Sequence, residues 1–117
     1  MIYNKTTTLS DTQKHTSVEK NYICILYNER TKNIQNMDSS RTCYEYDTIQ
    51  VFNGIPDYDS LVSYLIRLEY SQDMVESIIN NYLEDTTNSE DFKKLQEYRL
   101  NCKEIAKKCM ELYKLWK

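Results

Sequence analysis

The last quarter of the chain, residues 89–116, carries an apolar stripe with the spacing of a long helix. Its members follow one another at intervals that alternate between three and four residues, which is a heptad rhythm without a slip. A helix of this length spans about 40 Å. Such a stripe must be covered by protein, either by the chain's own shorter helices, by a second copy, or by both. The residues expected to pack or make contacts there are Phe92, Leu95, Tyr98, Arg99, Cys102, Ile105, Cys109, Leu112, Tyr113 and Trp116.

Arg99 is a charged residue at a core position of this stripe. In one interpretation its aliphatic stem is buried while the guanidinium reaches an acid of the preceding helices. The acids within its expected reach are Glu69, Asp73 and Glu76. In the other interpretation Arg99 fixes the register between copies, as buried polar residues do in coiled coils.

Charge is unevenly distributed between the last helix and the segment before it. Residues 55–91 contain one basic residue, Arg67, among many acids. Most of the charged residues in 92–117 are basic. Sequential helices joined by short connections are usually neighbours. We therefore expect the acidic segment and the basic helix to pair within the chain, with head-to-tail contact between copies as the alternative.

Two shorter helices are predicted before the long one. The first, about 58–69, follows a turn signal at Asn53-Gly54, and either Asp57 or Tyr58-Asp59 supplies the acid that a helix favours at its start. The second, about 72–83, begins after Ser71, which is a good N-cap residue. The long helix, about 89–116, is capped by Asn88 or Ser89.

Two strands are predicted upstream of the helices. Residues 22–27 form a short β-branched and apolar run, and residues 42–52 alternate with a phase slip that suggests a bulge in this strand. Antiparallel pairing of the two gives a hairpin in which Cys24 and Cys43 are able to face each other. Residues 1–20 are polar and have little to bury, so we expect an extended arm that a partner subunit holds in place.

Together these elements predict an α+β fold: an N-terminal β-hairpin followed by two short helices and one long amphipathic C-terminal helix, in a helical bundle. The arm covers residues 1–20 and a single domain covers residues 21–117. A two-stranded hairpin is marginal in water by itself. We therefore expect the hairpin to dock on the helices or to extend a sheet in another copy.

The sequence offers no expected catalytic, cofactor or metal site. A single glycine excludes the Gly-rich phosphate loops, and one histidine with four cysteines outside CxxC spacing gives metal binding little support. No apolar run is long enough to cross a membrane, and the N-terminus has no signal-peptide pattern. The basic face of the last helix is interrupted by acids every seven residues, which argues against nucleic-acid binding. These acids are Glu97, Glu104 and Glu111.

About half of the chain shows a family resemblance, carried mostly by helix positions. The matching residues are Pro56, Tyr58, Asp59, Leu61, Val62, Leu65, Ile66, Arg67, Tyr70, Ser71, Val75, Glu76, Ile78, Ile79, Asn80, Asn81, Tyr82, Leu83, Phe92, Leu95, Gln96, Tyr98, Arg99, Ala106 and Lys107. In these positions the chain resembles small uncharacterised proteins encoded by phages and prophages of gut Bacteroides-type bacteria, including crAss-like phages. The N-terminal half is similar only loosely, through residues 44–47 before the Asn53-Gly54 turn.

The resemblance implies a phage virion component at the tail, collar or fibre, made in the host bacterial cytoplasm and then present in the virion. We expect a structural or adaptor protein rather than an enzyme. It would act through contacts with itself, as a homo-oligomer, and with other virion proteins. The alternative is a phage effector outside the virion, either an inhibitor of a host factor or a tail-assembly chaperone. Light scattering of the purified protein tests for a homo-oligomer. Mass spectrometry of purified virions distinguishes a virion component from an effector.

Overall fold

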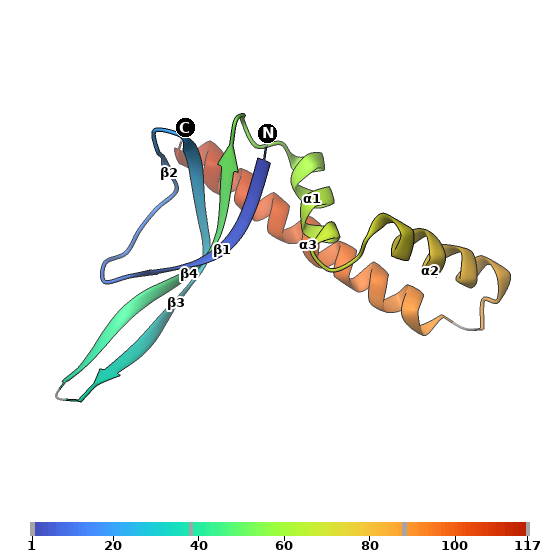
Figure 1. Ribbon diagram of the computed structural model, residues 1–117, viewed down its shortest axis with the longest axis horizontal. Helices are drawn as coiled ribbons and strands as arrows, with labels where there is room; N and C mark the ends of the chain where they lie inside the picture. The colour runs from blue at the N-terminus through green and yellow to red at the C-terminus, as the bar shows by residue number, and fades with distance from the viewer. Residues whose placement is uncertain (1, 38, 88, 117) are drawn as a thin grey trace. The chain divides into compact units, whose positions relative to one another are not determined.

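The computed structural model describes residues 2–37, 39–87 and 89–116, and it confirms the α+β class. A four-stranded antiparallel sheet is followed by three helices, of which the last is long (Figure 1). In chain order the elements are β1 (Ile2–Ser10), β2 (Ser17–Val18), β3 (Tyr22–Asn36), β4 (Ser39–Phe52), α1 (Tyr58–Arg67), α2 (Gln72–Glu84) and α3 (Glu90–Trp116).

The chain divides into two compact units by its internal contacts. The first unit contains residues 1–56 and 108–117, which are the sheet and the C-terminal turns of α3. The second unit contains residues 57–107, which are α1, α2 and the greater part of α3. The helix α3 therefore contributes residues to both units.

The sheet of the first unit has the strand order β1-β4-β3-β2. Its buried face carries alternate residues of the two central strands, because successive side chains of a strand point to opposite faces. Ile25 and Ile49 are paired across these strands and are both fully buried, and Val51 is 1% exposed. Cys109, from the part of α3 that belongs to this unit, is also fully buried.

The N-terminal segment differs from the expected arm. Residues 2–10 form β1, which pairs with β4 over nine residues, from Ile2 opposite Phe52 to Ser10 opposite Tyr44. Residues 17–18 form β2, which pairs with β3. Residues of this segment therefore pair with the chain's own sheet. Threonine is β-branched and favours strands, although a threonine-rich run lacks the hydrophobic pattern that would reveal one.

The central hairpin is longer than predicted, and its irregularity lies in the other strand. The register shifts between Tyr27 and Arg30, so that Asn28 and Glu29 of β3 stand opposite Tyr46 alone. Asn28 adopts a positive φ of 53°, which is the left-handed conformation that asparagine tolerates. This is a β-bulge in β3, and β4 is continuous where the sequence had suggested a phase slip. Cys24 lies opposite Gln50 rather than Cys43, and both thiols are free.

The helices of the second unit begin where their capping residues indicate. Asp57 caps α1 by accepting hydrogen bonds from the backbone amides of Asp59 and Ser60, which confirms its expected role. The Ser71 hydroxyl caps α2 by accepting from the Met74 amide at 3.1 Å. At the start of α3 the Lys93 amide donates to the Ser89 carbonyl at 2.9 Å, while the alternative cap, Asn88, lies outside the described residues.

Candidate protein-interaction surfaces

The apolar stripe of α3 is largely buried within a single chain. Leu95 and Cys109 are fully buried, Cys102 is 1% exposed and Tyr113 is 8% exposed. The stripe residues Phe92, Tyr98, Arg99, Ile105 and Leu112 are half-buried, and the side chain of Trp116 lies outside the described part. The sequence therefore located a packing surface: four of its nine described residues are core, and the other five keep part of their surface exposed.

Tyr98 joins α3 to the end of α1. Its hydroxyl donates to the Leu65 carbonyl at 2.8 Å, and its ring lies 5.4 Å from that of Tyr70. Leu65 is in the last turn of α1, where carbonyls have no partner within the helix. Burial is the main cause that raises the pKa of Tyr98 well above its ordinary value. The hydroxyl is therefore a structural donor, and it stays protonated.

Phe92 closes the connection between α2 and α3. Its ring stacks on that of Tyr82 with a centroid distance of 4.0 Å and an interplanar angle of 5°. Aromatic pairs add about 0.5–1.5 kcal/mol beyond the area that the rings bury. The start of α3 is thus fixed against the end of α2 by two aromatic residues that the sequence had placed on apolar faces.

Arg99 is half-buried, and it forms no ion pair with Glu69, Asp73 or Glu76 among the described residues. It lines a groove of about 270 Å³ between α1, the start of α2 and α3, together with Asp59 and Lys103. Among the described residues, one ion pair joins the acidic segment 55–91 to residues 92–117, between Glu90 and Lys94 at 3.6 Å, and it lies within α3. No described ion pair joins α1 or α2 to α3. Long surface side chains lose conformational freedom when they pair, so such pairs contribute little to stability.

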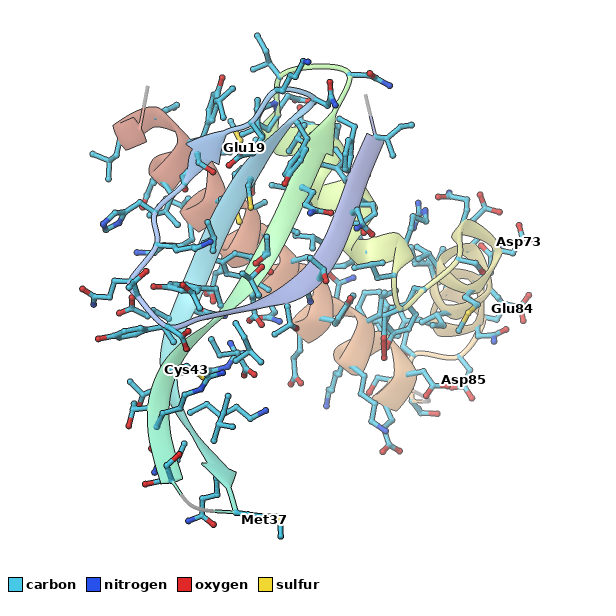
Figure 2. The ribbon with its side chains drawn as sticks, turned by 60° about the vertical axis from the view of Figure 1, so that its left-hand side comes forward. Glu19, Met37, Cys43, Asp73, Glu84 and Asp85 are labelled. Atoms are coloured by element: carbon cyan, nitrogen blue, oxygen red, sulfur yellow. The ribbon has the colours of Figure 1, made fainter. Side chains whose placement is uncertain are left out.

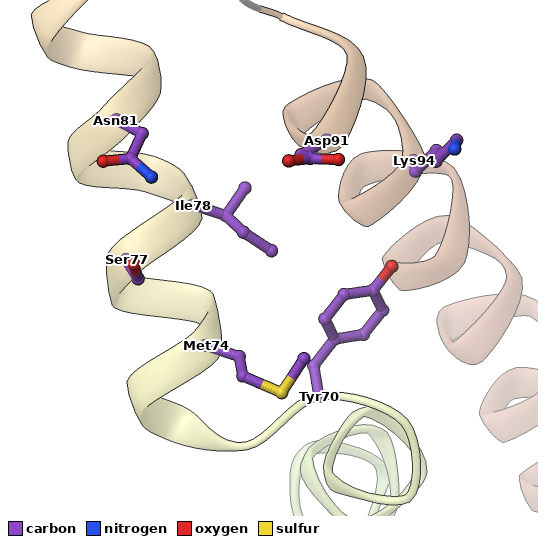
Figure 3. Close-up of a pocket in the computed structure, with 7 residues that line it drawn as sticks. All are labelled: Tyr70, Met74, Ser77, Ile78, Asn81, Asp91 and Lys94. Carbon is purple, nitrogen blue, oxygen red and sulfur yellow. The ribbon is translucent and has the colours of Figure 1, made fainter.

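A second hollow lies between α2 and α3 and is shown in Figure 3. It has a volume of about 390 Å³, with the side chains of Tyr70, Met74 and Ile78 on its apolar side. Its polar residues are Ser77, Asn81, Asp91 and Lys94. All four of these polar residues are exposed, so the polar side of the hollow is open to solvent.

The far end of the central hairpin is a two-stranded ribbon, which we define as residues 32–43. It extends past the last pair of β1 and β4, so its pairs from Lys32–Cys43 to Asn36–Ser39 have no third strand in the described sheet. Met37, at the tip, is fully exposed, whereas Cys43, where the ribbon joins the sheet, is 1% exposed (Figure 2). Isolated ribbons of this kind are marginal in water.

Charged side chains form cross-strand contacts where the ribbon joins the sheet, which we call the foot of the ribbon. The Arg30 guanidinium donates to Glu45 at 2.5 Å and to Asp47 at 3.1 Å, and the Lys32 ammonium lies 3.6 Å from the other oxygen of Glu45. The hydrogen bond from Arg30 is the main cause that lowers the pKa of Glu45. Cross-strand pairs of opposite charge stabilise an antiparallel ladder. These contacts join the paired strands of the ribbon to the rest of the sheet.

The two lateral edges of the sheet are unlike each other. At one edge β2 covers only two residues of β3, and β3 itself has the bulge at Asn28 and basic residues at Arg30 and Lys32. Bulges and lysine or arginine side chains are the devices that prevent edge-to-edge pairing. At the other edge β1 runs for nine residues in an unbroken register, with Lys5 as its single charged residue. Among the described residues, this strand has no register shift against β4.

The described residues 2–37, 39–87 and 89–116 contain no group of three or more histidine, cysteine or acidic side chains placed to hold a metal ion. In the same part of the chain, no helix is both long and apolar enough to cross a membrane. In comparisons with known proteins, no family model, no curated protein and no solved structure matches this chain.

Proposed function

We propose that this protein is an interaction module that acts by protein–protein contacts, as a structural or adaptor component of a phage virion at the tail, collar or fibre. The observation that supports the contact role best is the ribbon, which presents an exposed methionine on an ordered two-stranded projection. The phage setting rests on the resemblance of residues 56–107 to small phage-encoded proteins.

The ribbon suits a partner because its two strands are ordered before binding. Pre-ordered elements lose less conformational entropy on association than flexible segments do. Methionine is unbranched and polarizable, so an exposed Met37 adapts to pockets of varied shape. The polar side chains around it, such as Asn33 and Gln35, supply hydrogen-bonding groups for the rim of a contact.

The test of the virion role is the protein composition of purified particles of the phage that encodes the chain. Quantitative mass spectrometry is expected to find the protein in a fixed ratio to known tail or capsid proteins. Absence from purified particles, with abundance in infected cells, would refute the virion role and support the alternative, a phage effector that inhibits a host factor or assists tail assembly.

A shortened ribbon tests the contact role separately. Lys32 and Cys43 are paired, so replacing residues 33–42 by Asn-Gly closes the two strands with a two-residue turn. We expect this variant to keep the circular dichroism of the wild type and to be lost from particles. The matched control is Leu83→Ser, which removes an exposed apolar side chain from α2 and should leave incorporation unchanged. Normal incorporation of the shortened variant would show that the ribbon is not the contact.

A further inference from the structure

A groove within the helical unit combines cationic side chains with an apolar floor. It lies between α1, the start of α2 and α3, and all the residues that line it belong to the unit 57–107. We propose that this cationic groove binds an acidic segment of a partner protein, with a carboxylate on Arg99 and Lys103 and a neighbouring apolar side chain on the floor. The groove belongs to a different unit from the ribbon, although its assignment rests on the proposed role in protein–protein contacts.

Positive charge predominates in the cationic groove. Its lining includes three cations, Arg67, Arg99 and Lys103, whereas Asp59 is the one acid among the described residues that line it. Arg67, in the last turn of α1, donates a hydrogen bond to the Gln72 side chain. Arg99 and Lys103 are four positions apart in α3, so they lie on one face of that helix. A single anion is thus able to contact both.

Neither Arg99 nor Lys103 has an acidic partner among the described residues, since no described ion pair involves either side chain. Arg99 is nevertheless half-buried, and burial of a charge is costly unless the charge is paired. A guanidinium binds a carboxylate through two parallel hydrogen bonds, which makes this pair one of the stronger polar contacts. A carboxylate from a partner would supply the pairing that no described acid of the chain provides.

The floor of the cationic groove is apolar. Val62, Ile66 and Val75 line it, and all three side chains are buried. The volume of about 270 Å³ is below the roughly 300–1,000 Å³ of pockets that enclose small-molecule ligands. An apolar floor beside charged side chains resembles the apolar centre and polar rim of protein interfaces. The groove therefore fits a few side chains of a protein segment better than a cofactor.

Nucleic acid fits this surface less well than an acidic protein segment does. A phosphate backbone is bound by several cations in succession. Here Glu104 directly follows Lys103 in α3, and Asp59 lines the same groove, so successive phosphates would meet acids as well as cations. A single carboxylate needs only the two cations of α3.

The first experiment is an NMR titration of the full chain with the blocked peptide Leu-Glu-Glu-Leu. We expect saturable shifts of backbone amides in residues 58–67 and 99–103, which weaken as salt is added. The same peptide with glutamine in place of glutamate should bind at least about tenfold more weakly, because hydrogen bonds to charged groups are the stronger ones. Equal affinity of the two peptides, or no saturable shift in the groove, would overturn the proposal.

The second experiment repeats the titration with charge-removing variants. Arg99→Gln and Lys103→Gln should each weaken binding of the glutamate peptide by about tenfold. Lys107→Gln is the matched control, because Lys107 is an exposed lysine of the same helix that does not line the groove, and its affinity should match that of the wild type. Circular dichroism checks that the three variants keep the fold. Equal weakening by Lys103→Gln and Lys107→Gln would show general attraction to a basic helix and would overturn the proposal.

A competition experiment separates the two kinds of polyanion. A short single-stranded oligonucleotide is expected to displace the bound peptide only at a higher concentration than that of unlabelled peptide. Displacement at a lower concentration would assign the groove to nucleic acid and overturn the proposal.

A chain that is found in virions but whose groove does not bind the peptide would end this assignment while leaving the proposed function in place. A chain that binds the peptide in the groove but is absent from particles would do the opposite.

Discussion

The two ends of the β3–β4 hairpin are made from the same pair of strands, yet they differ in what surrounds them. At the base, Ile25 and Ile49 face each other in the sheet and are fully buried. In the ribbon, Ile34 is half-buried beside Arg41, and Met37 is fully exposed. Continuous strand pairing therefore does not imply a continuous core. The base stabilises the molecule, and the ribbon is ordered as an extension of it.

The largest expected difference comes from truncating one isoleucine at each end. Ile49→Ala removes a fully buried side chain from the base and should lower the free energy of unfolding by about 3 kcal/mol, measured by urea denaturation. Ile34→Ala makes the same change in the ribbon and should cost less than about 1 kcal/mol. Equal costs would mean that the ribbon packs against something in solution and that the contrast between the two ends is wrong.

Tyr46 lies at the junction of base and ribbon, and its hydroxyl should have the next largest effect. It donates to Glu29 at 2.5 Å and accepts from the Lys14 amide at 2.9 Å, while the residue is 3% exposed. Tyr46→Phe leaves the Lys14 amide without this acceptor and should cost about 1–2 kcal/mol in urea denaturation. Tyr44→Phe, two residues earlier, is the matched control and should cost less. A smaller loss for Tyr46→Phe than for the control would contradict this role.

The same hydroxyl predicts a dependence on alkaline pH. Burial, followed by the hydrogen bond to Glu29, raises the pKa of Tyr46 above its ordinary value of 10.0. The unfolded chain then releases this proton at lower pH than the folded chain, so the Tyr46 contribution is complete below the ordinary pKa and declines as pH rises beyond it. The free energy of unfolding should fall less steeply above about pH 10 in Tyr46→Phe than in the wild type. If the free energies of unfolding of the two proteins fell in parallel as pH rises, the Tyr46 hydroxyl would not be the cause of this dependence.

The smallest expected effect concerns the charged foot of the ribbon. Glu45→Gln weakens the contacts with Arg30 and Lys32, which are solvent-exposed, so global stability should hardly change. Amide hydrogens of the ribbon should nevertheless exchange faster with solvent, as measured by hydrogen exchange with mass spectrometry. Glu111→Gln on α3 is the control and should leave the ribbon unchanged. Uniform acceleration over the whole sheet would show that base and ribbon open together.

Acid should reproduce the effect of this substitution in the wild type. The pKa of Glu45 is lowered mainly by the hydrogen bond from Arg30, so the carboxylate is favoured in the folded state. Its contribution is present above the ordinary pKa of 4.5 and is lost as pH falls through the lower folded value. Protection of ribbon amides, corrected for the intrinsic exchange rate, should therefore decrease in this acidic range while protection at the base persists.

The helices were predictable because each of their signals is local. Asp57 and Ser71 lie directly before α1 and α2, and their caps depend only on the next three residues. The burial of Leu95, Cys102 and Cys109 was likewise indicated by helical periodicity. The sheet was not predictable in the same way. The pairing of β1 with β4 joins residues that are 34 to 50 positions apart, and a run of threonines has no apolar alternation that would reveal it.

The candidate surfaces were harder to predict than the core, for a related reason. The ribbon depends on where β1 ends against β4 and on the bulge at Asn28, and both are properties of strand register. Register follows hydrophobic pattern where one face is buried, but residues 32–43 are almost all polar and specify it weakly. The sequence thus placed the contact role on the α3 stripe, whose apolar periodicity is conspicuous.

The order of the strands has a consequence for synthesis of the protein. Of the described strands, β1 leaves the ribosome before the others, but its partner is complete only when Phe52 has followed. At elongation rates of about 5–20 residues per second, the nascent strand waits for seconds without its ladder. Its threonines remain well hydrated during that delay, whereas a valine-rich strand would be prone to aggregate. The polarity of β1 thus keeps the nascent chain in solution until its neighbour arrives.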